Sequence, residues 1–240
     1  MKLDILAFGS HPDDVELGCG GTLAKSVHQG KSVGIIDLSK GELSTKGDVD
    51  TRSHEALEAS RILGVDLRQN LELPDGYITN DKESQIKVIK KLREFKPEIV
   101  IATAREDRHI DHRNTNRLIN DSCFLSGLKK IRLTRDDGKP LSVWRPKIIL
   151  EYIQWNELRP DIIIDITGFL DKKSQSINAY KSQFFNTPEN VDITPISKPN
   201  FLISINNRAI NYGRLIGSQA AEGFTSPHPI AIKDLDHLLI

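Results

Sequence analysis

The chain has 240 residues, of which 38% are apolar, enough to bury one sizeable core in a single domain spanning residues 1–240. Lysine plus arginine and aspartate plus glutamate number 33 each, so the formal net charge is zero. This balance argues against nucleic acid or an anionic membrane as a partner and favours a compact, neutral small molecule.

The N-terminus and the cysteines predict a cytoplasmic protein. The first apolar stretch, residues 3–9, is short and interrupted by Asp4, and no later run approaches the length of a membrane span. Cys19 and Cys123 are too few for a disulfide framework and lack CxxC spacing, so we expect reduced, buried thiols.

Short apolar, β-rich runs alternate with amphipathic stretches along the chain. Because the runs are continuously apolar, they predict strands buried on both faces. The predicted strands cover residues 3–9, 33–38, 98–103, 147–153 and 161–166, and the predicted helices cover 14–29, 52–64, 82–95, 112–126, 170–184 and 206–220. This alternation predicts an α/β, Rossmann-like fold, with a mostly parallel sheet and helices on both faces. A long loop is expected at residues 186–200, which are rich in proline and asparagine.

Three polar segments directly follow predicted strands: SHPDD at 10–14, SKGELSTKGD at 39–48 and AREDRHIDH at 104–112. The carboxyl ends of parallel strands form the open edge of such a sheet, where ligands bind. We therefore expect all three segments to meet over one crevice.

The first and third segments together predict a zinc site. His11 and Asp14 can turn toward one ion, because Pro12 favours an extended backbone before it and Asp14 begins a helix. His112 is the expected third ligand. Three protein ligands of this kind leave one position for water, as catalytic zinc requires, and zinc lowers the pKa of that water to about 7.

The neighbouring residues predict the rest of a hydrolytic site. Asp13 is free to act as the general base if Asp14 binds the metal. His109 is a candidate donor to an oxyanion or a leaving amine, and Asp111 could orient His109 or His112.

Simpler roles compete with these. Asp13, Asp14 and Asp111 could cap helices instead, although capping and chemistry are compatible. We expect surface or packing roles for four further histidines: His28, His54, His228 and His237.

The motif His11-Pro12-Asp13-Asp14-Val15-Glu16 and the later His109-Ile110-Asp111-His112 resemble the signatures of the LmbE-like, or PIG-L-type, N-acetylglucosaminyl deacetylases, in which the second motif reads HPDH. Further similarity runs through Leu73-Pro74-Asp75-Gly76, Tyr180-x-Ser182-Gln183-Phe184 and Ala221-Glu222-Gly223-Phe224. Within the family the chain is most similar to the deacetylases of bacillithiol biosynthesis, which release acetate from N-acetylglucosaminyl-malate.

The resemblance implies the same zinc ligands, Asp13 as the base and His109 as the acid or oxyanion partner. It also implies that Arg52 binds the anionic aglycone, for which a planar guanidinium is suited, although the residue alone would suggest a surface position. Some relatives use a C-terminal tyrosine where this chain has Phe201, so another donor such as Tyr152 could compensate. Arg145 matches a residue near the site in some relatives, or faces solvent.

Other interpretations stay open. The substrate could be a different N-acetylated sugar, such as a lipid-linked or antibiotic precursor. Alternatively, Gly18-Cys19-Gly20-Gly21 could cradle a phosphate in a nucleotide-binding module, although its glycines more readily explain close helix packing. The metal could be iron, cobalt or manganese. The resemblance also implies a homo-oligomer.

Overall fold

The computed structural model describes residues 1–184 and 193–238. Seven strands form one sheet in the order β3-β2-β1-β4-β5-β7-β6. The strands are β1 (Ile5–Gly9), β2 (Val33–Asp37), β3 (Leu67–Asn70), β4 (Ile99–Thr103), β5 (Ile148–Tyr152), β6 (Ile162–Asp165) and β7 (Ala221–Thr225). Strands β1 to β5 pair in parallel, and β7 is antiparallel to β5 and β6, which confirms the predicted mostly parallel sheet.

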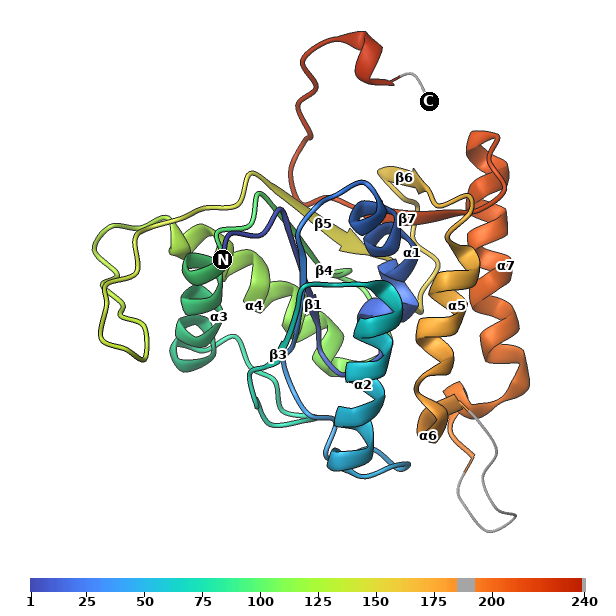
Figure 1. Ribbon diagram of the computed structural model, residues 1–240, viewed down its shortest axis with the longest axis horizontal. Coiled ribbons are helices and arrows are strands. Elements are labelled where there is room, and N and C mark those ends of the chain that lie inside the picture. Colours follow the sequence, from blue (N-terminus) through green and yellow to red (C-terminus); the bar gives the residue numbers. More distant parts are fainter. Residues whose placement is uncertain (185–192, 239–240) are drawn as a thin grey trace.

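Helices cover both faces of the sheet, as predicted (Figure 1). They are α1 (Asp14–His28), α2 (Val49–Leu63), α3 (Lys82–Phe95), α4 (Ile110–Ser126), α5 (Leu170–Asn178), α6 (Lys181–Phe184) and α7 (Pro199–Ile216). Helices α3 and α4 lie on one side, and α1, α2, α5 and α7 lie on the other. The single helix predicted at 170–184 is divided into α5 and α6.

The apolar pattern of β1 explains why both faces are covered. Leu6 and Phe8 pack into the core beneath α3 and α4, whereas Ile5 and Ala7 pack beneath α1. Because successive side chains of a strand point to opposite faces, a continuously apolar strand needs a helix layer on each side. Buried on both sides, β1 lies at the centre of the parallel part of the sheet.

The glycines of α1 let this helix lie against the sheet. A Cβ on Gly18 would lie 2.1 Å from the Tyr152 ring, and one on Gly21 would lie 2.6 Å from Ile166. Both glycines fall inside α1, so they offer no helix N-terminus to a phosphate. The packing interpretation is confirmed.

Apart from shifts of up to three residues at other helix ends, two strands and both ends of one helix differ from the sequence prediction. Strand β3 was missed because its residues, LRQN, are polar and only half-buried, and β7 was missed because AEGFT contains glycine and glutamate. The helix predicted at 206–220 begins at Pro199 and ends before Gly217, whose φ is 74°. Of the predicted loop 186–200, residues 193–198 include a 3₁₀ turn (Pro195–Ser197), and 186–192 lie outside the described residues.

A buried ion cluster joins β3 to its neighbours. The Arg68 guanidinium donates through Nε and Nη2 to the two oxygens of Asp37, at 2.7 and 2.8 Å, and through Nη1 to Glu16 at 2.5 Å. The Tyr180 hydroxyl also donates to Glu16, at 3.1 Å. These contacts tie β2, β3 and α1 together behind the HPDD motif, and we refer to the four residues as the Arg68 cluster.

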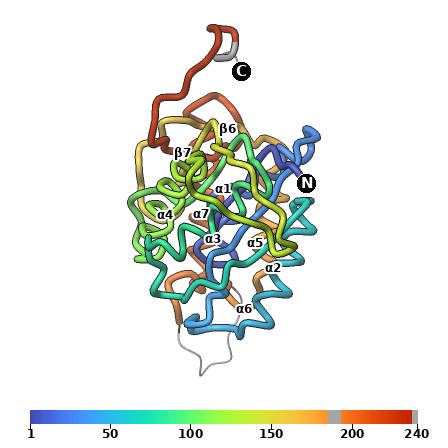
Figure 2. Tube along the Cα trace, turned by 90° about the vertical axis from the view of Figure 1, so that its left-hand side faces the viewer, coloured from blue at the N-terminus to red at the C-terminus, as the bar shows by residue number. Residues whose placement is uncertain are grey.

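Several smaller predictions can be checked in the described chain. Cys19 and Cys123 are free and buried, as expected. His28, His54 and His228 are exposed, while the His237 side chain lies outside the description. No helix of the described residues is long and apolar enough to cross a membrane. Figures 1 and 2 show the segment after β7 leaving the body of the molecule.

Candidate metal centre

The three polar segments predicted to meet do so at the carboxyl edge of the sheet, around a cavity of about 290 Å³. The segment after β1 contributes His11, Asp13 and Asp14, and the segment after β2 contributes residues 43–45. The segment after β4 contributes residues 107–109 and 112. Further walls come from the chain after β3 and β5 and from residues near the start of α7.

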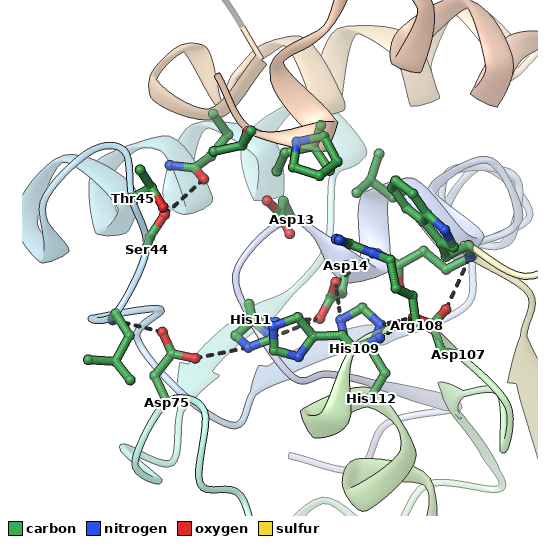
Figure 3. Close-up of a pocket in the computed structure, with 18 of the residues that line it drawn as sticks. His11, Asp13, Asp14, Ser44, Thr45, Asp75, Asp107, Arg108, His109 and His112 are labelled. Atoms are coloured by element: carbon green, nitrogen blue, oxygen red, sulfur yellow. Dashed lines mark hydrogen bonds and ion pairs between the residues drawn. The ribbon is translucent and has the colours of Figure 1, made fainter. Parts of the chain in front are cut away.

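The Asp14 carboxylate lies between two imidazoles (Figure 3). Its Oδ2 is 3.3 Å from His11 Nδ1, and its Oδ1 is 3.1 Å from His112 Nε2. Donors bound to a tetrahedral zinc at about 2.0–2.1 Å lie about 3.3 Å from one another. The spacing of each imidazole to the carboxylate therefore suits a shared small ion.

Local backbone structure aims this carboxylate. Asp14 opens α1, and its Oδ2 accepts the backbone N–H of His11 at 2.8 Å. Asp13, at the N-cap, has an unusual φ of 121° and makes no side-chain capping bond. The Asp13 side chain therefore does not cap α1, because it points away from the backbone N–H groups of the first helical turn.

Asp13 and Arg52 form a buried pair beside the cavity. Arg52 Nη2 donates to the Pro12 carbonyl at 2.5 Å and lies 3.3 Å from Asp13 Oδ2. Burial raises the pKa of Asp13 to about 7, with Arg52 opposing the shift and Asp14 adding to it. Arg52 is thus part of the cavity wall and not a surface residue of α2.

His109 is the N-cap residue of α4 and faces the cavity. Its Nδ1 accepts the backbone N–H of Asp111 at 3.2 Å, so the neutral ring carries its proton on Nε2. Burial, followed by the charges of His11 and His112, lowers the pKa of His109. A neutral ring with a free N–H donor suits the predicted oxyanion role.

The structure corrects the expected position of Asp111. Its carboxylate contacts neither His109 nor His112 but accepts the backbone N–H groups of Gly76 and Ile78, at 2.7 and 3.2 Å. It also lies 3.3 Å from His11 Nε2. Asp111 therefore orients His11, because α4 turns it toward the loop that follows β3.

Three residues that contact the predicted metal ligands were not predicted from the sequence: Asp107, Asp75 and Gln154. Asp107 Oδ1 is 2.9 Å from His112 Nδ1, Asp75 Oδ1 is 3.0 Å from His11 Nε2, and Gln154 donates to Asp14 Oδ1 at 2.7 Å. Each follows the end of a strand, which is the signal that could have identified them.

The charges gathered here fit a bound cation. Five buried aspartates surround the imidazoles: Asp13, Asp14, Asp75, Asp107 and Asp111. One buried guanidinium, that of Arg52, contacts this group. Buried carboxylates need paired cations or a metal. Among the described residues, two sets of three offer one donor atom each within 4.8 Å of one another: His11/His109/His112 and His11/Asp75/Asp111. The predicted set His11/Asp14/His112 is not one of them, since Asp14 faces the two imidazoles with different oxygens.

The imidazoles respond to this negative environment. Burial alone would lower the pKa of His11, but hydrogen bonds to Asp111, Asp14 and Asp75 raise it well above its usual value. Burial likewise opposes protonation of His112, yet the Asp14 charge and the Asp107 hydrogen bond raise its pKa to about 9. In the metal-free protein, protons occupy positions that a metal ion would take.

Comparison with known proteins agrees with this geometry. The sequence profile of the family described as PIG-L: GlcNAc-PI de-N-acetylase matches residues 6–123, which include both histidine motifs. The conserved protein TT1542 from Thermus thermophilus is 35% identical, with 96% of this chain and 97% of that chain covered and a TM-score of 0.85. The chain belongs to the PIG-L family.

Curated relatives differ in their named activities. The diacetylchitobiose deacetylase of Thermococcus kodakarensis is 27% identical over 229 residues, covering 91% of this chain and 81% of that protein. The 4-oxalmesaconate hydratase of Pseudomonas putida is 25% identical over 193 residues, covering 74% of this chain and 73% of that protein.

The residues expected from PIG-L relatives beyond the two motifs are only partly at the site. Phe201 lines the cavity and stacks on Trp155 and Phe184, with ring centroids 5.7 and 5.9 Å apart. Tyr152 cannot replace a tyrosine there, because its buried hydroxyl donates to the Phe8 carbonyl at 3.2 Å. Arg145 is exposed and donates to the Phe124 carbonyl, away from the cavity.

A second guanidinium stands at the mouth of the cavity. Arg108 is exposed and lies over the Trp155 indole, 4.2 Å from the ring centroid. Both residues line the cavity beside Asp107, whose Oδ2 accepts the backbone N–H of Trp155 at 3.1 Å. The site therefore combines acidic groups inside with a cation and aromatic surface at its entrance.

Proposed function

We propose that this PIG-L-family protein is a zinc-dependent N-deacetylase of N-acetylglucosaminyl-malate that yields acetate and glucosaminyl-malate in bacillithiol biosynthesis. The observation that carries the proposal is the Asp14 carboxylate held between His11 and His112 on an open cavity, with Asp13 beside it and paired to Arg52. The diacetylchitobiose deacetylase relative acts on an N-acetylated sugar, which supports an amide of the same class.

In this proposal His11, Asp14 and His112 hold the zinc ion. When bound, the ion supplies Lewis-acid polarisation of the amide carbonyl and activation of water near neutral pH. Asp107 orients His112, while Asp75 and Asp111 orient His11. No further function is assigned to these three aspartates.

The residues around the ion then move protons and stabilise charge. Asp13 accepts a proton from the attacking water and passes it to the leaving nitrogen as the C–N bond breaks. His109 donates from Nε2 to the carbonyl oxygen as that oxygen becomes negative. The water oxygen is then bonded to the acyl carbon and both water protons are on the nitrogen, so the products are acetate and the ammonium form of the amino sugar.

Arg52 and Arg108 line the cavity and can bind the carboxylates of an anionic aglycone. We assign its carboxylates to Arg52, whose buried Nε has no hydrogen-bond partner among the described residues, and to the exposed Arg108. Charge-assisted hydrogen bonds contribute about 1.5–3 kcal/mol each. We therefore expect kcat/KM for N-acetylglucosaminyl-malate to exceed that for N-acetylglucosamine by about 10- to 100-fold.

The test measures acetate release from both substrates, before and after zinc removal by a chelator. Loss of activity on chelation and its return with Zn²⁺ are expected. Equal rates on the two substrates would exclude the malate assignment and favour another N-acetylated sugar. Hydration of an unsaturated acid without acetate release would instead match the activity named for the Pseudomonas putida relative.

Arg52→Met and Arg108→Ala refine the test. Arg52 also contacts Asp13, so Arg52→Met is expected to lower activity on both substrates. The preference for N-acetylglucosaminyl-malate over N-acetylglucosamine falls only if Arg52 binds the aglycone. Self-association and a cytoplasmic location stay predictions. Light scattering of the purified protein tests the first, and fractionation of the producing cells tests the second.

A further inference from the structure

Gln154 lies just beyond β5, with its side chain buried at the cavity wall. Its Nε2 donates to Asp14 Oδ1 at 2.7 Å. A carboxylate only accepts hydrogen bonds, so this contact fixes which end of the amide faces Asp14. The same carboxylate receives the His11 backbone N–H on its other oxygen, so each oxygen has its own donor.

The opposite end of the Gln154 amide is unpaired. Its Oε1 is buried and has no hydrogen-bond partner within residues 1–184 and 193–238. A buried amide that only stabilises a fold is expected to have both ends bonded. The unpaired Oε1 of Gln154 therefore adds no stability to the metal-free fold.

A second glutamine of the same cavity shows the contrast. Gln183 is also buried, but both ends of its amide are bonded. Its Nε2 donates to the Lys46 carbonyl at 2.7 Å, and its Oε1 accepts from the Ser44 hydroxyl at 3.2 Å. Gln183 holds the loop after β2 and does not contact a predicted metal ligand.

The backbone of Gln154 is also held in place. Arg208 of α7 donates through Nη1 to the carbonyls of Ile153, at 3.2 Å, and Gln154. This anchor positions the chain where β5 ends. The amide thus reaches Asp14 from a fixed backbone, as a group that orients a ligand must.

We infer that Gln154 is the positioning residue for Asp14, and that its N–H group aims the carboxylate at the metal. This inference rests on the proposed metal-dependent function. Hydrogen bonds to ligating carboxylates commonly affect metal affinity by 10- to 100-fold. Gln154 itself moves no proton and binds no metal.

The experiment compares Gln154→Leu with Gln183→Leu, using Zn²⁺ alone as the probe. A competing chromophoric chelator gives the zinc dissociation constant of each full-length protein, and thermal unfolding of the metal-free proteins gives their melting temperatures. Gln154→Leu is expected to weaken zinc binding about 10- to 100-fold without lowering the melting temperature. Gln183→Leu is expected to lower the melting temperature and leave zinc affinity unchanged.

A zinc affinity of Gln154→Leu within twofold of the parent would overturn the inference. So would a variant that unfolds, because Gln154 would then be a structural residue. Acetate release by the parent protein is measured separately. An active parent with unchanged zinc binding in Gln154→Leu contradicts only this inference, whereas weakened zinc binding in a parent without deacetylase activity contradicts only the proposed reaction.

Discussion

The Arg68 cluster and the metal centre are two buried groups of charged side chains that share α1, yet they are built differently. In the Arg68 cluster one guanidinium pairs directly with two carboxylates. At the metal centre five buried aspartates surround imidazoles, and Arg52 contacts one of them. Buried charge alone therefore does not indicate function.

The metal centre differs from the Arg68 cluster in two ways: its carboxylates outnumber the guanidinium groups that contact them, and they lie beside a cavity. Its carboxylates converge on three imidazoles at a cavity of about 290 Å³. In the Arg68 cluster, by contrast, the guanidinium itself donates hydrogen bonds to both carboxylates. The comparison predicts that substitutions at the metal centre lower zinc binding or activity, whereas those in the Arg68 cluster lower stability without loss of zinc.

The largest effect is expected for Asp14→Asn. Loss of the central carboxylate should remove bound zinc and lower acetate release about 10⁴-fold or more, because metal activation and charge stabilisation disappear together. Metal analysis and an acetate assay measure both. The melting temperature of the metal-free protein at pH 7 should fall as well. Burial alone would raise the pKa of Asp14, but the His112 charge and the hydrogen bonds to both imidazoles hold it well below its usual value, so the ionised carboxylate stabilises the fold. A folded Asp14→Asn protein that keeps its zinc would contradict the assignment of Asp14 as a ligand.

Arg68→Met tests the other side of the comparison. It leaves Asp37 and Glu16 buried without their cation and should lower the free energy of unfolding by about 3–5 kcal/mol. Urea unfolding measures this change. Zinc bound per folded molecule should stay as in the parent, and its loss would show that the two groups are not separable.

His109→Ala is expected to have the next largest effect. Without its Nε2 donor, acetate release should fall about 10²- to 10³-fold, the usual effect of losing one oxyanion donor. Zinc content should be unchanged. If zinc is lost as well, the alternative ligand set His11/His109/His112 holds the ion.

Asp107→Asn should have a smaller effect. Asp107 orients His112 and also accepts the backbone N–H groups of His109 and Trp155, each at 3.1 Å. Because it is not a predicted metal ligand, zinc affinity should fall about 10- to 100-fold while saturating Zn²⁺ restores most of the activity. A titration of activity against free Zn²⁺ measures the shift. Activity that stays low at saturation would indicate a direct role in the reaction.

Much of the fold was predictable because five of the strands are continuously apolar. That pattern, alternating with amphipathic helices, is enough to predict a parallel sheet covered on both faces. Strands β3 and β7 carry arginine, glutamine or glutamate where the pattern requires apolar residues. Their polar side chains are satisfied by partners distant in sequence, such as Lys173 for Glu222, which local patterns do not reveal.

The candidate site was predictable to the level of which segments meet. His11, Asp13, Asp14, Arg52, His109 and His112 all line one cavity. Which carboxylate orients which imidazole was not predictable, because it depends on loop paths. Asp75 follows a strand that was missed, and Asp111 faces that same loop.

The backbone of Asp13 has a consequence for heat resistance. A residue other than glycine at φ 121° carries a conformational penalty of about 1–3 kcal/mol. Glycine is ordinarily less stabilising than alanine, but at this position Asp13→Gly should melt above Asp13→Ala, since both lack the carboxylate and only glycine tolerates the torsion. The strained φ at residue 13 thus lowers thermal stability. The substitution that removes this strain, Asp13→Gly, also removes the proposed general base.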